Sequence, residues 1–242
     1  MKNGKIKLAK LTVEIKSVYD HPEIFNNYAT EENADFSVEI SEEDIKEEEK
    51  NSRAECKYEG IPYPEFSKIE LENTAIYRKI AQRITQYDAI VFHASAVAVD
   101  GKCYLFTAKS GTGKTTHTKL WLKNINGSFV VNGDKPILRV IDGIAYVCGT
   151  PWMGKERYGD NIQIPLKSMC ILERGKENKI EEISFSKALP VIYEQMYRPR
   201  EKNQLIMSLN TLGKLKECVK FYRLKCNMND DAAIVSYNGM CK

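Results

Sequence analysis

The residues of this 242-residue chain best suited to chemistry form a glycine-rich run, AKSGTGKTT, over residues 108–116. The run matches the phosphate-binding pattern G-x-x-x-x-G-K-[ST] at every defining position but the first, where Ala108 replaces glycine. In such loops, backbone N–H groups and the start of the following helix face phosphate oxygens, a lysine contacts the outer phosphates, and a hydroxyl ligates Mg²⁺. The pattern predicts that ATP and Mg²⁺ bind here, through Ser110, Gly111, Thr112, Gly113, Lys114, Thr115 and Thr116, with Thr115 on the metal.

Ala108 is compatible with this loop only if its φ angle is negative, because a Cβ is strained elsewhere. Gly111 and Gly113 supply the conformational freedom that the rest of the loop needs. A glycine-rich strand-to-helix turn that binds nothing is the alternative. The order strand, loop, Lys-Thr and helix favours a nucleotide site instead.

A second acidic position follows about twenty residues later, where the apolar run SFVV (128–131) leads into Asn132, Gly133 and Asp134. A carboxylate at the carboxyl end of a strand beside such a loop is where an Mg²⁺-binding aspartate lies, so Asp134 is the predicted second metal ligand and a catalytic candidate. The alternative is a turn residue before Pro136, because Asn-Gly-Asp is also favourable turn chemistry.

Three further side chains are catalytic candidates. The loop GTPWMGKERYGDN (149–161) carries the cations Lys155 and Arg157, either of which could neutralise charge on a transferring phosphoryl group or could be an ordinary surface cation. His93 lies 21 positions before Lys114 and could face the phosphates if the intervening segment folds back beside the loop; a lone histidine next to an apolar run is otherwise structural.

The elements that would position these residues are mainly strands. Two strand-like runs, 94–99 and 102–108, flank Asp100-Gly101, and a second pair, 136–141 and 144–148, flanks Asp142-Gly143; Asp-Gly in this setting indicates a type I′ hairpin. A helix is expected over 116–125. Because a hairpin directly precedes the phosphate-binding loop, we expect an α/β fold with a mixed sheet built partly from hairpins.

The flanking regions suggest a small α+β lobe over residues 1–72 and a nucleotide-binding domain over residues 73–242. Period-two alternation over 5–18 and 35–40 indicates strands, and the acidic run 42–49 a solvated helix face or loop. Helical spacing appears from residue 73 to about 87, over 186–197 and 201–218, which would cap the domain, and over 230–237; residues 219–226 resemble a strand.

Composition limits the classes of partner. Residues 1–92 hold 13 Lys and Arg against 19 Asp and Glu, whereas residues 93–242 hold 23 against 14, a basic balance that suits a phosphate-rich ligand. These cations are scattered and no RNA-binding motif occurs, so nucleic acid is not expected. Seven cysteines without C-x-x-C pairs argue against a zinc site and for a reduced interior. With no run of about 18 apolar residues, we expect a cytoplasmic protein without membrane contact.

The segment HASAVAVDGKCYLFTAKSGTGKTT (93–116), and the chain onward to Leu172, resembles the core of the HPr kinase/phosphorylase family, and SGTGKTT is especially similar to the loop of ATP-dependent phosphoenolpyruvate carboxykinase, which shares that fold. The chain resembles the short stand-alone bacterial proteins of this type. The resemblance implies a catalytic role for His93. The family has two adjacent aspartates at the strand end, and Gly133 replaces the first here. Three alternatives remain. Asp134 both binds the metal and accepts the proton, His93 accepts the proton, or this protein does not phosphorylate a serine in the same way as the family.

The resemblance and the motifs together imply an ATP- and Mg²⁺-dependent kinase that transfers the γ-phosphoryl group to a hydroxyl, either of a serine in a protein or peptide or of a small molecule. A nucleotide-binding regulatory or partner module without catalysis is the alternative. A carboxykinase is disfavoured, since the chain is too short for that family's second domain. Analogy with the family also suggests a homo-oligomer.

Overall fold

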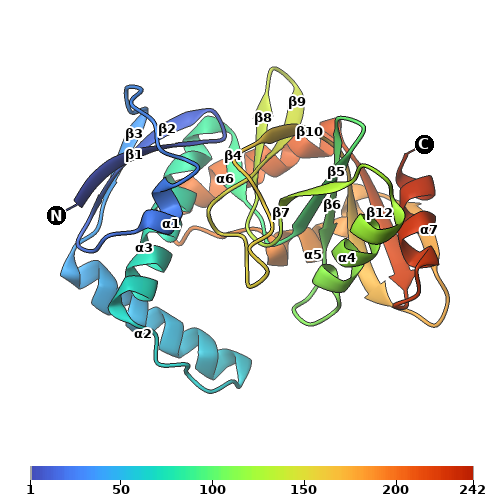
Figure 1. Cartoon of the computed structure of the whole chain (residues 1–242), viewed down its shortest axis with the longest axis horizontal. Coiled ribbons are helices and arrows are strands. Elements are labelled where there is room, and N and C mark those ends of the chain that lie inside the picture. The colour runs from blue at the N-terminus through green and yellow to red at the C-terminus, as the bar shows by residue number, and fades with distance from the viewer. Residues whose placement is uncertain (1, 242) are drawn as a thin grey trace. The chain divides into compact units, whose positions relative to one another are not determined.

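A computed structural model describes residues 2–241 (Figure 1). Met1 and Lys242, the outermost residues of the two predicted domains, lie outside this range. The chain divides into two compact units, one ending at Arg83 and one beginning at Ile84. The division therefore falls eleven residues after the predicted boundary at residue 72, which lies inside helix α3 (Lys68–Arg83).

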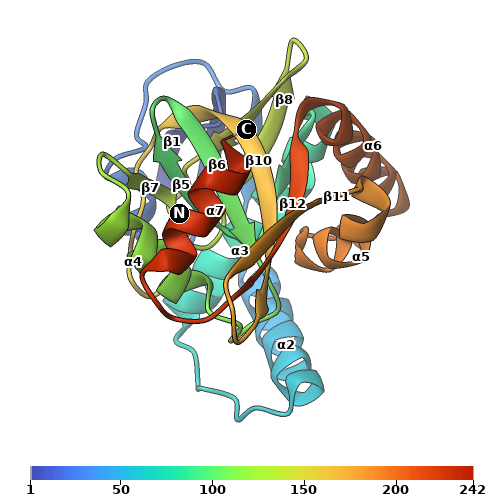
Figure 2. The same cartoon turned by 90° about the vertical axis from the view of Figure 1, so that its right-hand side faces the viewer.

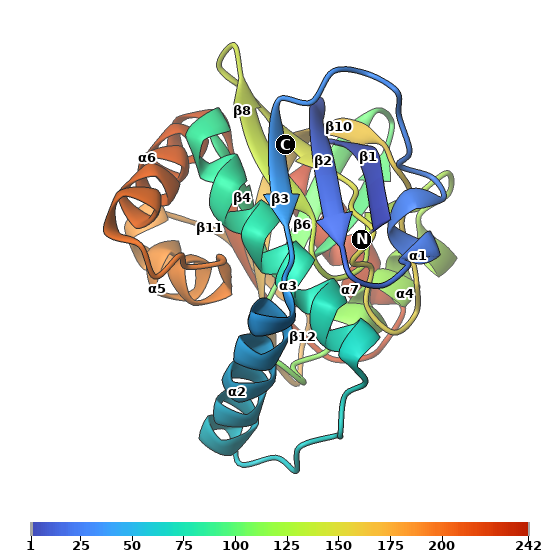
Figure 3. The same ribbon diagram turned by 90° about the vertical axis from the view of Figure 1, so that its left-hand side faces the viewer.

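The first unit is a three-stranded sheet with helices. Its strands β1 (Lys2–Leu8), β2 (Leu11–Ser17) and β3 (Phe36–Glu39) lie in the order β1-β2-β3, with β1 antiparallel and β3 parallel to β2 (Figure 3). The short helix α1 (Pro22–Phe25) follows β2, and the acidic run begins α2 (Glu42–Glu59), whose start is capped by Ser41. The predicted alternation is confirmed, because Ile6, Val13 and Ile15 are fully buried.

Helix α3 belongs to this unit because a buried carboxylate ties it to the chain after β2. Glu72 accepts hydrogen bonds from the backbone N–H groups of Val18 (2.6 Å) and Tyr19 (2.8 Å), and one of its oxygens lies 3.0 Å from Nε2 of buried His21. A buried carboxylate requires such partners, so Glu72 holds α3 in the first unit.

The second unit is built on a curled mixed sheet of nine strands (Figure 2). Seven of them follow the order β4-β8-β9-β10-β6-β5-β7; β12 adds to β10, and β11 to β12. Their bounds are β4 (Ala89–Val91), β5 (Ser95–Val99), β6 (Lys102–Thr107), β7 (Phe129–Asn132), β8 (Ile137–Ile141), β9 (Ile144–Cys148), β10 (Gln163–Arg174), β11 (Lys179–Ile183) and β12 (Lys220–Cys226). Strand β10 is parallel to both β6 and β12, and the other pairs are antiparallel.

Both predicted hairpins are confirmed. Asp100 and Gly101, between β5 and β6, have φ angles of 52° and 70°, and Asp142 and Gly143, between β8 and β9, have 49° and 76°. Positive φ at both central residues is the type I′ requirement, which Asp-Gly meets at little cost. The sequence did not predict bounds for β10 and β11, although β10 is the strand that lies between β9 of the second hairpin and β6 of the first.

Helices cover both faces of this sheet. Helices α5 (Phe185–Gln195) and α6 (Lys202–Cys218) pack on one face, and α4 (Lys114–Asn124) and α7 (Asp231–Met240) pack on the other; a short 3₁₀ helix, η1 (Ile84–Tyr87), precedes β4. Successive residues of strand β5 face opposite sides of the sheet. Ala96 and Ala98 belong to the first core, on the side of α5 and α6, whereas Val97 and Val99 belong to the second core, on the side of α4 and α7. Across residues 2–241, no helix combines the length and apolar character needed to cross a bilayer.

The second core contains a buried histidine that makes stability depend on pH. His117 contacts Ser236 through Nε2 (3.1 Å), and burial lowers its pKa from 6.5 to about 4. His117 binds a proton near pH 6.5 in the unfolded chain but only near pH 4 in the native state. Its contribution to the free energy of unfolding is therefore complete above pH 6.5 and is lost as the pH falls toward 4. We expect a loss of about 3 kcal/mol between pH 7 and pH 4.

Urea unfolding of wild type and His117→Gln at a series of pH values measures this loss, because glutamine does not titrate. The slope of unfolding free energy between pH 6.5 and 4 should be markedly smaller in the variant. Equal slopes in the two proteins would show that His117 is not the group responsible.

Candidate functional site

Three segments meet at one edge of the sheet because of strand direction. The antiparallel β5–β6 hairpin pairs Ser95 with Phe106, so the same register places His93, two residues before β5, opposite Ala108 at the start of the loop after β6. Strand β7 pairs antiparallel with the other side of β5, with Ala96 opposite Asn132, so the end of β7 arrives at the same edge. His93, the loop after β6 and Asp134 are thereby brought together.

The phosphate-binding loop has the backbone that its sequence predicts. Ala108 is buried and is absent from the residues with positive φ, as its Cβ requires, whereas Gly111 and Gly113 have φ angles of 73° and 123°. Helix α4 begins directly after Gly113. Lys114 folds back over the loop and donates from Nζ to the Ala108 carbonyl (3.2 Å). Burial lowers the pKa of Lys114, and the nearby Asp134 charge opposes that shift.

His93 and Asp134 form a close pair. His93 Nε2 lies 3.1 Å from Asp134 Oδ1, and Lys135 Nζ lies 3.2 Å from Oδ2. Burial would raise the pKa of Asp134, but the hydrogen bond from His93 and the charge of Lys135 outweigh it and lower that pKa to about 2. The carboxylate is therefore ionised at neutral pH. Lys135 was not among the predicted site residues, although it directly follows Asp134 in the sequence.

Buried hydrogen bonds hold the turn that carries Asp134. Asn132 Oδ1 accepts from the backbone N–H groups of Asp134 (2.9 Å) and Lys135 (2.8 Å), and Asn132 Nδ2 donates to the carbonyl of buried Thr150 (3.0 Å). The side chain that caps the turn is thus that of Asn132, which leaves the Asp134 carboxylate in the pocket. Asn132 and Thr150 are positioning residues that were not predicted, although the turn chemistry of Asn-Gly-Asp pointed to the first of them.

The loop 149–161 packs against this turn at Gly133. Gly133 N donates to the Tyr158 carbonyl (2.8 Å), and a Cβ on Gly133 would lie only 2.8 Å from the Met153 carbonyl oxygen. An aspartate at position 133, where the HPr kinase pattern has one, therefore does not fit beneath this loop. Glu156 also contacts Lys119 of α4 at 3.0 Å.

A pocket of about 590 Å³ contains most of the predicted site residues. It is lined by His93, Asp134, Lys155 and six of the seven predicted loop residues: Ser110, Gly111, Gly113, Lys114, Thr115 and Thr116. The structure does not bring Thr112 or Arg157 into it. Arg157 is exposed and has a φ angle of 51°. Its backbone N–H donates to the Gly154 carbonyl (3.2 Å) within a local turn. Tyr158 and Ser95 line the pocket and were not predicted.

The donors in this pocket fit Mg²⁺ held jointly with phosphates. Mg²⁺ binds through one or two carboxylates, with waters and phosphate oxygens completing its shell. Asp134 and Thr115 line the same pocket, and the Asp134 oxygens have lone-pair positions beyond those that His93 and Lys135 occupy. Within residues 2–241 there is no cluster of three His, Cys, Asp or Glu side chains that could hold a metal ion. The fit is therefore to an ion whose ligands come from both the protein and the phosphates.

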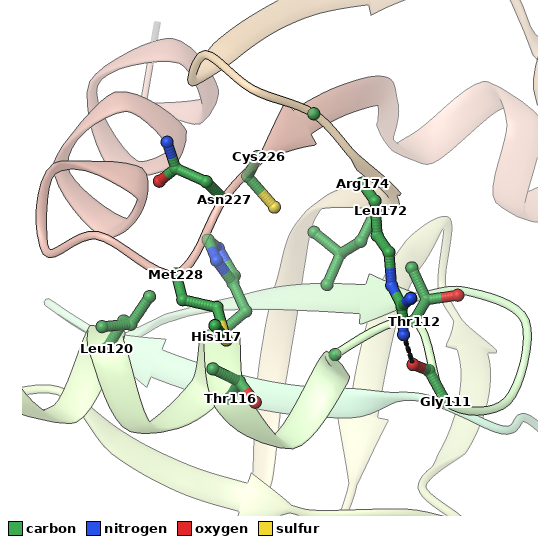
Figure 4. Close-up of a pocket in the computed structure, with 12 residues that line it drawn as sticks. Gly111, Thr112, Thr116, His117, Leu120, Leu172, Arg174, Cys226, Asn227 and Met228 are labelled. Carbon is green, nitrogen blue, oxygen red and sulfur yellow. Dashed lines mark hydrogen bonds between the residues drawn. The ribbon is translucent and has the colours of Figure 1, made fainter.

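A second pocket, of about 490 Å³, adjoins the first at the phosphate-binding loop (Figure 4). Gly111, Gly113 and Thr116 line both pockets, and Thr112 lines only the second. Arg174, at the end of β10, donates from Nη2 to the Gly111 carbonyl (2.6 Å) and so links the loop to the far wall. The two pockets therefore share the residues of the loop as a common wall.

Gly149 permits the close return of the loop 149–161, and alanine there should be destabilising. A Cβ at this position would lie 1.8 Å from the Asp160 carbonyl oxygen and 2.9 Å from that of Val131, both backbone atoms that cannot move independently. We expect Gly149→Ala to lower the free energy of unfolding by about 3 kcal/mol, as measured in urea.

Gly213→Ala is the matched control, because an added Cβ there meets nothing within 4 Å and the residue lies within helix α6. It should stabilise the protein by about 1 kcal/mol. An unfolding midpoint for Gly149→Ala equal to that of wild type would contradict the packing described for the loop.

Comparison with known proteins gives a distant structural likeness. The chain matches no family model and no curated protein. Among solved structures it is similar to the HPr(Ser) kinase/phosphatase from Coxiella burnetii, at 10% sequence identity and a TM-score of 0.37, over 61% of this chain and 94% of that one.

Proposed function

We propose that this protein is an ATP-dependent kinase that transfers the γ-phosphoryl group to a hydroxyl acceptor. The observation that carries the proposal is that His93, Asp134 and Lys114 lie in one pocket with the N-terminus of α4. A cation, an ionised carboxylate and an imidazole around a phosphate-binding loop are the groups that phosphoryl transfer requires. We assign the domain, on the same grounds, to the phosphoenolpyruvate carboxykinase-like class of P-loop kinases.

In this proposal the chain supplies position and charge. Backbone N–H groups of the loop and Lys114 bind the β- and γ-phosphates, and Lys155, at the outer side of the pocket, steadies charge on the transferring group. Thr115 and Asp134 would hold Mg²⁺, which supplies further charge neutralisation when bound. The acceptor oxygen forms a bond to the γ-phosphorus, the bond from that phosphorus to the bridging oxygen of ADP breaks, and the hydroxyl proton is transferred to the enzyme.

We assign that proton to His93 rather than Asp134. Despite burial, the His93 and Lys135 contacts lower the pKa of Asp134 to about 2, so its carboxylate is a weak proton acceptor. With the Nε2–H of His93 directed at Asp134, neutral imidazole keeps its lone pair on Nδ1, where it can accept a proton. Asp134 then orients the ring and stabilises the imidazolium that forms.

A nucleotide-binding module without catalysis is the second candidate. It is favoured by Gly133, since the loop 149–161 occupies the space that a second aspartate would need. In such a module the same pocket would bind ATP, and the conformation of the loop 149–161 would change on ATP binding and be recognised by a partner.

Transfer of labelled γ-phosphate from Mg-ATP into a desalted extract of the source organism tests the kinase. Purified wild type should label a protein or peptide that Lys114→Ala does not label, and mass spectrometry of that species would identify the acceptor. If labelling is absent with wild type, the assay is repeated with small-molecule extract and released ADP is measured. ATP binding without acceptor-dependent ADP release in either extract would favour the module.

A further inference from the structure

The second pocket lies between helix α4 and the connections that follow β10 and β12, and none of the steps proposed above uses it (Figure 4). Because Gly111, Gly113 and Thr116 line both pockets, a molecule whose phosphates lie at the loop can continue into this second hollow. The group that enters the second hollow is the part of the ligand that is attached to the phosphate chain.

The surface of this hollow away from the loop is mainly apolar. Leu120 of α4, Leu172 of β10 and Met228 surround it together with Cys226. Met228 is 78% exposed, which leaves a large flexible apolar side chain at the mouth without a partner to cover it. An apolar ligand surface between Leu120 and Met228 would bury both side chains.

The polar groups of the far wall already bond to one another. Asn227 donates from Nδ2 to the Lys176 carbonyl (2.9 Å), and its Oδ1 accepts from Asn178 Nδ2 (3.1 Å). His117 contacts Ser236 through Nε2, and its Nδ1, which has no hydrogen-bond partner among the described residues, is buried beneath the pocket surface. The Asn227 amide is thus already paired, and the His117 nitrogen is out of reach of a ligand.

Arg174 is the charged residue of the pocket, and its guanidinium faces the phosphate end. It donates to the Gly111 carbonyl at 2.6 Å, and Figure 4 shows it beside Thr112. Its positive charge therefore lies where the phosphate chain begins, away from Leu120 and Met228. A ligand group between those two residues is recognised by shape and apolar contact.

We propose that this pocket receives the nucleotide base and selects it by size, so that ATP and GTP bind with similar affinity and a pyrimidine nucleotide binds more weakly. The inference rests on the proposed function, since it needs a triphosphate at the loop. Two fused rings bury more apolar area than one. Discriminating adenine from guanine requires hydrogen-bond partners for their edges, and the Asn227 amide of this wall is already paired within the protein.

Equilibrium binding of four Mg²⁺ complexes, those of ATP, GTP, CTP and inorganic tripolyphosphate, tests the proposal. Wild type should bind ATP and GTP within tenfold of each other, CTP more than tenfold more weakly, and tripolyphosphate, which has no base, about 100-fold more weakly than ATP. Met228→Ser and Leu120→Ser should each weaken ATP and GTP five- to tenfold and leave tripolyphosphate unchanged. Leu122→Ser, an exposed leucine of the same helix outside the pocket, should alter none.

Other outcomes separate this inference from the function on which it rests. A preference between ATP and GTP above tenfold would overturn selection by size. Equal affinity for ATP and tripolyphosphate, with Met228→Ser silent, would overturn the base site while the phosphate site stands. If no complex binds, the proposed function falls and takes the inference with it. Thermal unfolding checks that Leu120→Ser is folded, and Met228→Ser tests the same pocket at an exposed position.

Discussion

Replacing Lys114 by alanine should weaken Mg-ATP binding about 100-fold and reduce phosphoryl transfer to background. Lys114 lines the pocket, is half-buried there, and donates a hydrogen bond to the Ala108 carbonyl of the loop. Its ammonium group is therefore available for phosphate oxygens, and charge-assisted hydrogen bonds of this kind are about twice as strong as neutral ones. Isothermal titration with Mg-ATP and with Mg-tripolyphosphate should give similar losses, because both ligands present the same phosphates.

Lys109→Ala is the matched control, since Lys109 is an exposed lysine of the same segment that does not line the pocket. It should leave both affinities within about twofold of wild type. If Lys109→Ala and Lys114→Ala weaken binding equally, the effect comes from the basic character of the segment, and the specific role of Lys114 is refuted.

Replacing Asp134 by asparagine should lower the transfer rate about 1000-fold while ATP affinity at saturating Mg²⁺ changes less than tenfold. Asparagine keeps the size of the side chain but removes the charge that contacts His93 at 3.1 Å and Lys135 at 3.2 Å. It therefore loses the orientation of the imidazole, the stabilisation of an imidazolium and the anionic ligand for Mg²⁺ together. Binding is largely spared because the loop and Lys114 hold the phosphates.

Single-turnover transfer measured beside nucleotide binding separates the two effects. Asp142→Asn is the control, because asparagine is equally suited to the type I′ turn at Asp142-Gly143 and that hairpin does not line the pocket. Unchanged transfer in Asp134→Asn would eliminate Asp134 as a functional residue. A parallel loss of binding and transfer would show instead that Asp134 maintains the loop.

Several features could be predicted from the sequence because local sterics decide them. Asp-Gly determines the φ angles of both hairpin turns, and each turn sets the register of the two strands that it joins. In the first hairpin that register places His93 opposite Ala108, at the start of the phosphate-binding loop. The glycines of that loop and the helix after it are likewise determined within a few residues, so this part of the site followed from the sequence.

Other features depend on which strand pairs with which. Asp134 meets His93 because β7 joins the free edge of β5, and no local pattern specifies that partner. Strand β10, which lies between β9 and β6, was given no bounds, because Pro165, Lys167 and Ser168 interrupt the apolar pattern in its first half. The division between the two units was misplaced for a similar reason, since buried Glu72 binds to residues more than fifty positions earlier.

The sequence by itself therefore determined the phosphate-binding loop, the two hairpins and the α/β class, because each is decided by the φ preferences and spacing of neighbouring residues. The tertiary structure alone decided three things. It placed Lys155 in the pocket and Arg157 outside it, it made Gly133 a packing requirement of the loop 149–161, and it brought Met228 to the pocket beside α4. Each depends on contacts between segments far apart in the chain, where packing and buried hydrogen bonds outweigh local preference.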